Sequence, residues 1–208
     1  MLHIYFFILS TALLVSWYGP LRRADQLWLR YWIIFVLFCE YGLAEYLKVT
    51  HQNNILLFNI YPILTVCFYL MIFLKGLSKP YVLLVWTLFA LSTYFQFDIK
   101  SITSVLNSKI YLSGLTLTSI SICIHLKKMI EIGNNVTIEP MCQPTTVLGI
   151  GILLFYVSSF PLLFFAETLI TNSIAFKAYY DLLLIGNIFL AVGYLGAALA
   201  SSPILKHF

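Results

Sequence analysis

The sequence predicts an all-α membrane protein: a single seven-transmembrane-helix bundle with the N-terminus outside and the C-terminus in the cytoplasm. Seven apolar runs fill most of the 208 residues, and nearly every charge lies between them. Each run is about long enough to cross a hydrocarbon core of roughly 30 Å as a helix. Barrel strands are shorter, about 10 residues, and alternate apolar with polar. The expected helices cover Leu2–Tyr18, Leu27–Leu47, Ile55–Leu74, Tyr81–Phe97, Ile110–Leu126, Val147–Ile170 and Leu182–Ser202.

The composition supports the same fold class. The chain is 61% hydrophobic and 10% charged, with a mean hydropathy of +0.93, whereas a soluble domain carries about 25% charged residues. One soluble core cannot hide this much apolar surface, so lipid has to cover it. We therefore expect one transmembrane domain over residues 1–208. The first run has no basic residue before it, which distinguishes it from a cleaved signal peptide, and it is kept as a helix.

The lysines and arginines of the loops predict the orientation. With the N-terminus outside, the inner segments carry eight basic residues and the outer segments carry four. The net charge of +4 then reflects positive inner loops and requires no nucleic acid. The eight inner residues are Arg22, Arg23, Arg30, Lys75, Lys79, Lys127, Lys128 and Lys206, and the four outer ones are Lys48, Lys100, Lys109 and Lys177.

No pattern of metal, disulfide or nucleophile chemistry is present in the sequence. The four cysteines form no C-x-x-C pair, and the four histidines lie at scattered depths. Ser158 and Ser159 lie near mid-depth, away from His125 at the inner end of its helix, so a Ser–His pair is not expected. We expect no metal, no cofactor and no catalytic residue.

Glu40 is the most informative polar residue, because it lies near the middle of the second helix. An ionisable group at that depth costs about 2.5–3.5 kcal/mol on insertion scales. We expect Glu40 to face the bundle interior and to be protonated at neutral pH. Its function is then either to bind a proton or ligand, or to form a structural hydrogen bond between helices.

Further polar residues fall in the outer half of other helices, and together they predict a ligand pocket. Pro62 and Pro161 are expected to break two of these helices beside the pocket. Ordinary interhelical hydrogen bonding explains the same residues without a pocket, and Glu45 and Glu167 can lie at the interface with water. The candidate pocket comprises Glu40, Asn59, Tyr61, Ser158, Glu167 and Asn187.

Two surfaces are candidates for packing or partner contact. Small residues recur every four positions in the last helix and allow close approach of another helix, either inside the bundle or in a homo-oligomer; they are Gly193, Gly196, Ala197 and Ala200. The first inner loop is the most charged and is expected to contact acidic lipid or a cytosolic partner, through Arg22, Arg23, Trp28 and Arg30.

Two segments, Phe58–Tyr61 (FNIY) and Pro144–Ser159 (PTTVLGIGILLFYVSS), resemble small, largely uncharacterised bacterial seven-helix membrane proteins often encoded near sensor histidine kinases. Members often carry a glutamate further along the third helix, where this sequence reads Ile63–Cys67 without one. The resemblance implies a multi-pass protein of the cytoplasmic membrane that acts as a sensor or signalling accessory.

Three classes of function follow from these observations. The first is a membrane sensor or signalling accessory that binds a ligand in the outer half of the bundle and relays the signal to a partner protein. The second is an oligomeric pore, transporter or membrane effector that works with a soluble partner, for which the hydroxyl-rich helix at Ile110–Leu126 is the best candidate. The third is an intramembrane lipid-active enzyme with Glu40 and Glu167 as its acids.

The orientation can be tested with single cysteines in a variant that lacks the four native ones. An impermeant maleimide added to intact cells is expected to label a cysteine at Gln52 and to spare one at Asn134, because the loop Lys127–Thr146 is predicted to be cytoplasmic. Permeabilised cells provide the control, since both sites then become accessible. Labelling at Asn134 and not at Gln52 would invert the topology.

Overall fold

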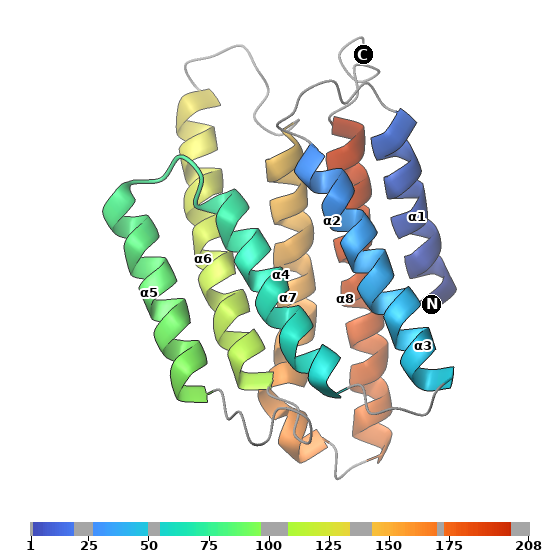
Figure 1. The fold of residues 1–208 in the computed structure, drawn as a ribbon. Helices are drawn as coiled ribbons and strands as arrows, with labels where there is room; N and C mark the ends of the chain where they lie inside the picture. Colours follow the sequence, from blue (N-terminus) through green and yellow to red (C-terminus); the bar gives the residue numbers. More distant parts are fainter. Residues whose placement is uncertain are drawn as a thin grey trace.

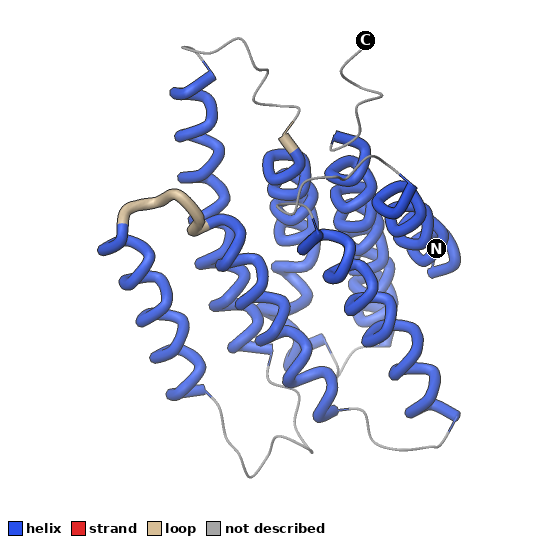
Figure 2. Tube along the Cα trace, turned by 45° about the horizontal axis from the view of Figure 1, so that its top comes forward, coloured by secondary structure: helices blue, strands red, loops and turns tan. Residues whose placement is uncertain are grey.

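The computed structural model describes residues 2–18, 27–49, 55–96, 108–133, 143–169 and 173–200. Within these ranges every regular element is a helix, and the helices run side by side as a bundle (Figures 1 and 2). The all-α prediction is therefore confirmed. The elements are α1 (Leu2–Tyr18), α2 (Leu27–Leu37), the π-helix η2 (Phe38–Leu43), α3 (Ala44–Val49), α4 (Ile55–Phe73), α5 (Lys79–Gln96), α6 (Ser108–Gly133), α7 (Pro144–Leu169) and α8 (Ser173–Ala200).

Because α2, η2 and α3 follow one another without interruption, the described chain forms seven continuous helical rods. Three of them contain stretches long and apolar enough to cross a membrane: Lys109–Glu131, Pro144–Pro161 and Asp181–Ala200. These three candidate spans indicate a multi-pass membrane protein. Crossing by all seven rods, and the direction in which they cross, stay predictions from the sequence.

Two helices extend well beyond the apolar runs that predict them. α8 begins at Ser173 and not at Leu182, and α6 continues to Gly133 instead of ending near Leu126. An apolar run ends where the side chains become polar, but backbone hydrogen bonding continues past that point. In the extension of α6, Lys127 and Glu131 lie one turn apart, with their side-chain charges 3.9 Å from each other on an exposed face.

The prolines do not break their helices, contrary to expectation. α4 continues through Pro62 and α7 continues through Pro161. Helices packed in a membrane bundle tolerate proline when neighbouring groups and small local adjustments satisfy the freed carbonyl. The departure from α-helical geometry lies instead in η2, around Glu40.

Close packing of α7 against α8 forms the centre of the bundle. A Cβ atom added at Gly151 would lie 2.7 Å from the Cα of Gly193, and one added at Gly193 would lie 3.0 Å from the Cα of Gly151. Only two glycines permit such an approach of two backbones. Gly196 faces Val147 of α7 in the same way, and Ala197 is buried. The small-residue face of α8 thus packs inside the bundle.

The other helices are arranged around this pair. α1 packs along α8, α6 packs along α7, and α5 lies at the edge of the bundle against α6 (Figure 1). Aromatic rings fill the space between α2 and α4, where Trp32 and Phe68 stack with ring centroids 3.7 Å apart. The rings of Trp28 and Phe35 extend this layer in both directions along α2.

The α4–α5 turn, the start of α2, the end of α6 and the start of α7 lie at one end of the bundle, which we call the basic end (Figure 1). Its described basic residues are Arg30, Lys75, Lys79, Lys127 and Lys128. Gly76 forms the turn with a φ of 83°, a left-handed conformation that favours glycine. The ammonium group of Lys128 donates a hydrogen bond to the Gly76 carbonyl, which ties the turn to α6.

We expect Gly151→Leu to lower the free energy of unfolding by at least about 1–3 kcal/mol, because the new side chain meets the backbone of α8. Thermal unfolding in detergent, followed by circular dichroism, measures the effect. Ala90→Leu is the matched control, since Ala90 is exposed on α5. Equal melting temperatures for the two variants would contradict the observed α7–α8 contact.

Candidate functional site

A hydrogen-bonded cluster surrounds Glu40 between three helices. The hydroxyl of Tyr61 on α4 donates to Oε1 of Glu40 at 2.6 Å, and the hydroxyl of Tyr5 on α1 donates to Oε2. Glu40 therefore faces the bundle interior, and each of its oxygens has a partner from a different helix. We call Tyr5, Glu40 and Tyr61 the carboxyl cluster.

The π-helical segment η2 directs Glu40 inward. Along its first four residues the exposure changes abruptly: Phe38 and Tyr41 are 61% and 57% exposed, whereas Cys39 between them is 7% exposed. A π-helix widens the turn and changes the angle between successive side chains, and such segments are frequent at functional sites. Cys39 and Glu40 thus share the inner face of the segment, and the two aromatic rings flanking them point outward.

The two hydrogen bonds from tyrosine contribute enough free energy to hold a carboxylate at this depth. Hydrogen bonds to a charged group contribute about 1.5–3 kcal/mol each, and an acidic side chain at the centre of a membrane helix costs about 2.5–3.5 kcal/mol. Two such bonds offset that cost. Loss of either tyrosine hydroxyl leaves one carboxyl oxygen in apolar surroundings without a partner.

The protonation state of Glu40 determines how the tyrosines bond. An ionised carboxylate accepts one hydrogen bond at each oxygen, which uses both tyrosine hydroxyls as donors. A neutral acid donates from one oxygen, so the tyrosine at that oxygen has to become an acceptor and turn its own hydrogen elsewhere. Gain or loss of a single proton therefore changes the contact between α2 and either α1 or α4.

A second buried polar group lies on the basic side of the carboxyl cluster. The indole Nε1 of Trp32 donates to the hydroxyl of Tyr194 at 2.8 Å, and that hydroxyl also bonds to the hydroxyl of Tyr69 at 2.8 Å. Tyr69 and Tyr194 have no exposed surface. This indole–tyrosine triad joins α2, α4 and α8, so together the two groups connect four helices through polar contacts.

Two further tyrosines lie near these groups. Tyr111 of α6 packs against the same core. The hydroxyl of Tyr156 on α7 bonds to the hydroxyl of Thr116 on α6 at 2.9 Å. Tyrosine hydroxyls thus supply most of the described interhelical polar contacts in the core.

The structure brings together part of the predicted ligand set. Glu40 and Tyr61 are joined directly, and Asn59 is buried one half-turn before Tyr61 on α4. Ser158 bonds to the carbonyls of its own helix and lies against Gly186 of α8.

The last two members of the predicted set lie on α8 and α7. Asn187 is half-buried on α8, and the side chain of Glu167 lies outside the described part of α7. The pocket formed by all six residues therefore stays a prediction.

Sequence reasoning missed Tyr5, Trp32 and Tyr194 because hydropathy treats an aromatic ring as apolar. The positions of the tyrosines along their helices could nevertheless have identified partners of Glu40. Tyr5 and Tyr61 lie about one to two turns inside their helices from the same end of the bundle, and Glu40 lies about two and a half turns from that end of its rod. A buried carboxyl requires donors, and tyrosine provides one at low cost in an apolar segment.

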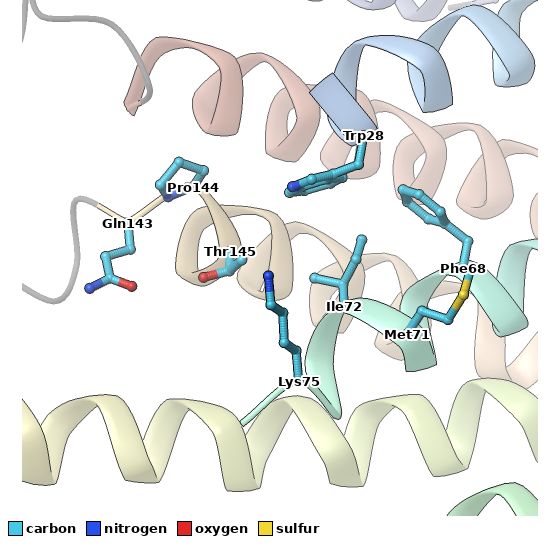
Figure 3. A pocket seen from close by; sticks show the side chains of 8 residues that line it. All are labelled: Trp28, Phe68, Met71, Ile72, Lys75, Gln143, Pro144 and Thr145. Atoms are coloured by element: carbon cyan, nitrogen blue, oxygen red, sulfur yellow. The ribbon is translucent and has the colours of Figure 1, made fainter. Parts of the chain in front are cut away.

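The structure contains a cavity of about 460 Å³ at the basic end, opposite to the predicted outer pocket. None of its lining residues belongs to the predicted ligand set, but Trp28, predicted to contact lipid or a partner, forms one wall (Figure 3). The cavity is lined by Trp28, Phe68, Met71, Ile72, Lys75, Gln143, Pro144 and Thr145.

The remaining residues of the charged first loop divide into two groups. Arg30 donates to the carbonyl of Ser16 from Nε at 3.1 Å and from a terminal nitrogen, and its guanidinium lies 5.0 Å from the ring centre of Trp17. It therefore caps the last turn of α1 and holds α2 against it. Arg22 and Arg23 lie outside the described residues.

The carboxyl cluster can be tested by a double-mutant cycle of Glu40→Gln and Tyr61→Phe, measured by unfolding in mixed detergent micelles. We expect a coupling energy of about 0.5–3 kcal/mol, as for residues in direct contact. Glu40→Gln alone should fold nearly normally, whereas Glu40→Lys should lose at least about 2.5–3.5 kcal/mol or fail to fold.

A cycle of Glu45→Gln and Tyr31→Phe is the control for this experiment, because both residues are exposed on the same rod. Its coupling energy is expected to be near zero. A coupling of the same size in the two cycles would show that Glu40 and Tyr61 do not interact specifically.

Within the described ranges no three of the His, Cys, Asp and Glu residues lie close enough to hold a metal ion. No family model matches the sequence, and neither a curated protein nor a solved structure is similar to it.

Proposed function

We propose that the protein is a multi-pass membrane sensor, or signalling accessory, whose input acts at the carboxyl cluster and whose output is relayed to a partner protein. The observation that carries the proposal is a half-buried carboxyl group in a π-helical segment, hydrogen-bonded to tyrosines of two other helices. Ionisable groups at membrane depth are rare and mark functional sites. The input is a proton, or a small ligand with a hydrogen-bond donor, that reaches Glu40 from the outer half of the bundle.

The cluster suits a switch because one proton changes which tyrosine donates and which accepts. Two groups bond directly to Glu40 and share in this change: Tyr5 from α1 and Tyr61 from α4. No basic side chain is among these contacts. The carboxyl group is therefore the member of the cluster that changes charge most readily.

The relay to a partner rests on the continuity of α2. Glu40 and Trp32 lie on the same helical rod, about two turns apart, and Trp32 connects α2 to α8 through Tyr194. A shift of this rod alters helix contacts toward the basic end. The exposed lysines there, Lys79 and Lys127, offer an acidic partner a surface to bind.

The hydroxyl groups of α6 favour the sensor over an oligomeric pore. Thr118 and Ser121 bond to carbonyls one turn earlier on their own helix, at 2.9 Å each, and both residues are buried. Hydroxyls used in this way do not line a continuous wet path. A lipid-active enzyme requires a second acid close to Glu40, whereas the described residues that bond to Glu40 are tyrosines.

The proposal is tested by a pH titration of the purified protein in nanodiscs, with tryptophan emission as the readout. A variant that retains only Trp32 isolates the signal of the indole–tyrosine triad. We expect its emission to change in a single one-proton transition as the pH is varied. The physical reason is that protonation of Glu40 rearranges the contacts between α1, α2 and α4.

Glu40→Gln is expected to abolish the transition, and Glu45→Gln, an exposed carboxylate of the same rod, is expected to leave it unchanged. Flux of small ions through proteoliposomes is measured in parallel to detect a pore. A transition that persists in Glu40→Gln, or a flux that depends on Glu40, would overturn the sensor proposal.

A further inference from the structure

The cavity at the basic end has a polar half and an apolar half, and it lies apart from the carboxyl cluster. Figure 3 shows Gln143, Pro144 and Thr145 at one side, with the Lys75 side chain extended toward Thr145. Phe68, Met71 and Ile72 line the other side. A volume of about 460 Å³ lies within the range of small-molecule sites, roughly 300–1,000 Å³.

Aromatic packing holds the wall of the apolar half in place. The ring of Phe68 stacks on that of Trp32, which is itself held by its hydrogen bond to Tyr194. Trp28 lies with its ring centre 5.8 Å from that of Phe68. Met71 is 60% exposed, so the apolar half meets the surface of the bundle where lipid lies. An acyl chain can enter from that side.

The polar half attracts an anion for two independent reasons. Lys75 carries a positive charge, and no described carboxylate forms an ion pair with it or lines the cavity. α7 also begins here: the Gln143 carbonyl accepts the first backbone bonds, from the amides of Thr146 and Val147. The amide of Thr145 precedes them and has no partner within the helix, and the helix dipole adds positive potential at this end.

We propose that this cavity binds an anionic phospholipid of the adjacent leaflet, with the phosphate between Lys75 and the first turn of α7 and one acyl chain between Trp28 and Phe68. The charge of the polar half selects an anion, and the lipid-facing apolar half selects an attached chain. Trp28 is the second residue of α2, at the basic end, and tryptophan is preferred at membrane interfaces. This proposal does not rest on the proposed sensor function, because the cavity shares no residue with the carboxyl cluster.

Quenching by brominated lipid tests the proposal directly. A variant whose only tryptophan is Trp28 is reconstituted with increasing fractions of phosphatidylglycerol or phosphatidylcholine, each brominated on one acyl chain. We expect saturable quenching that half-saturates at a lower fraction of phosphatidylglycerol. Lys75→Gln should raise that half-saturating fraction about five-fold, since one lysine near an anionic surface contributes about 1 kcal/mol.

Lys79→Gln removes the same charge from the same turn without altering the cavity, and it should leave the half-saturating fraction unchanged. Equal quenching by both lipids, or equal effects of the two lysine variants, would overturn the proposal.

Thermal stabilisation of the unmodified chain in detergent gives a second readout that does not depend on replacing tryptophans. Added phosphatidylglycerol should raise the melting temperature of the wild type more than that of Lys75→Gln. Inorganic phosphate and glycerol phosphate, which lack the chain, should have little effect. Stabilisation by phosphate alone would identify a free anion site and refute the lipid, and no stabilisation by any of the three would refute a specific site.

Discussion

The arrangement of the first three rods depends on satisfying the carboxyl group of Glu40. Neither lipid nor a dry core supplies it with hydrogen bonds, so the protein has to supply them. The hydroxyls of Tyr5 and Tyr61 do so from α1 and α4. Both helices therefore have to turn these hydroxyls toward α2, and the π-helix η2 lies at the residue that receives them.

Tyrosine is well suited to this task in an apolar bundle. Its ring packs as a large hydrophobic group, and its hydroxyl remains neutral while it donates or accepts. The buried residues Tyr5, Tyr69 and Tyr194 all combine the two roles: each packs in the main core and each bonds through its hydroxyl. A core built this way is connected by hydrogen bonds without the insertion cost of several charged groups.

The sequence predicted the helices well and the site only in part. Hydropathy located each helix because apolar side chains and a transmembrane length occur together, but it could not follow α8 back to Ser173 or α6 on to Gly133, where the helices become polar. The inward direction of Glu40 was predictable from the cost of a charge in lipid. Its partners were not, because the register between α1, α2 and α4 depends on packing and on the π-helical segment.

Dependence on packing also explains why the predicted helix breaks at the prolines were wrong and why the cavity was not predicted. Pro62 and Pro161 remove backbone donors, but whether a helix breaks depends on neighbours that a sequence does not reveal. The cavity at the basic end is formed by α2, α4 and α7, and its residues are apolar except for Lys75, Gln143 and Thr145. No local pattern marks a site composed of three separate segments.

Phe68 lies between the cavity and the indole–tyrosine triad. One face of its ring stacks on Trp32, whose indole belongs to the triad next to the carboxyl cluster, and the residue also lines the cavity. The spacing between α2 and α4 is therefore shared by both sites. Occupation of the cavity can then change proton binding at Glu40 by changing that spacing. In that case the two effects are reciprocal: bound lipid changes the free energy of proton binding by the same amount as protonation changes the free energy of lipid binding. Contact alone does not establish such coupling, but it identifies the α2–α4 interface as the element that both sites have to bias.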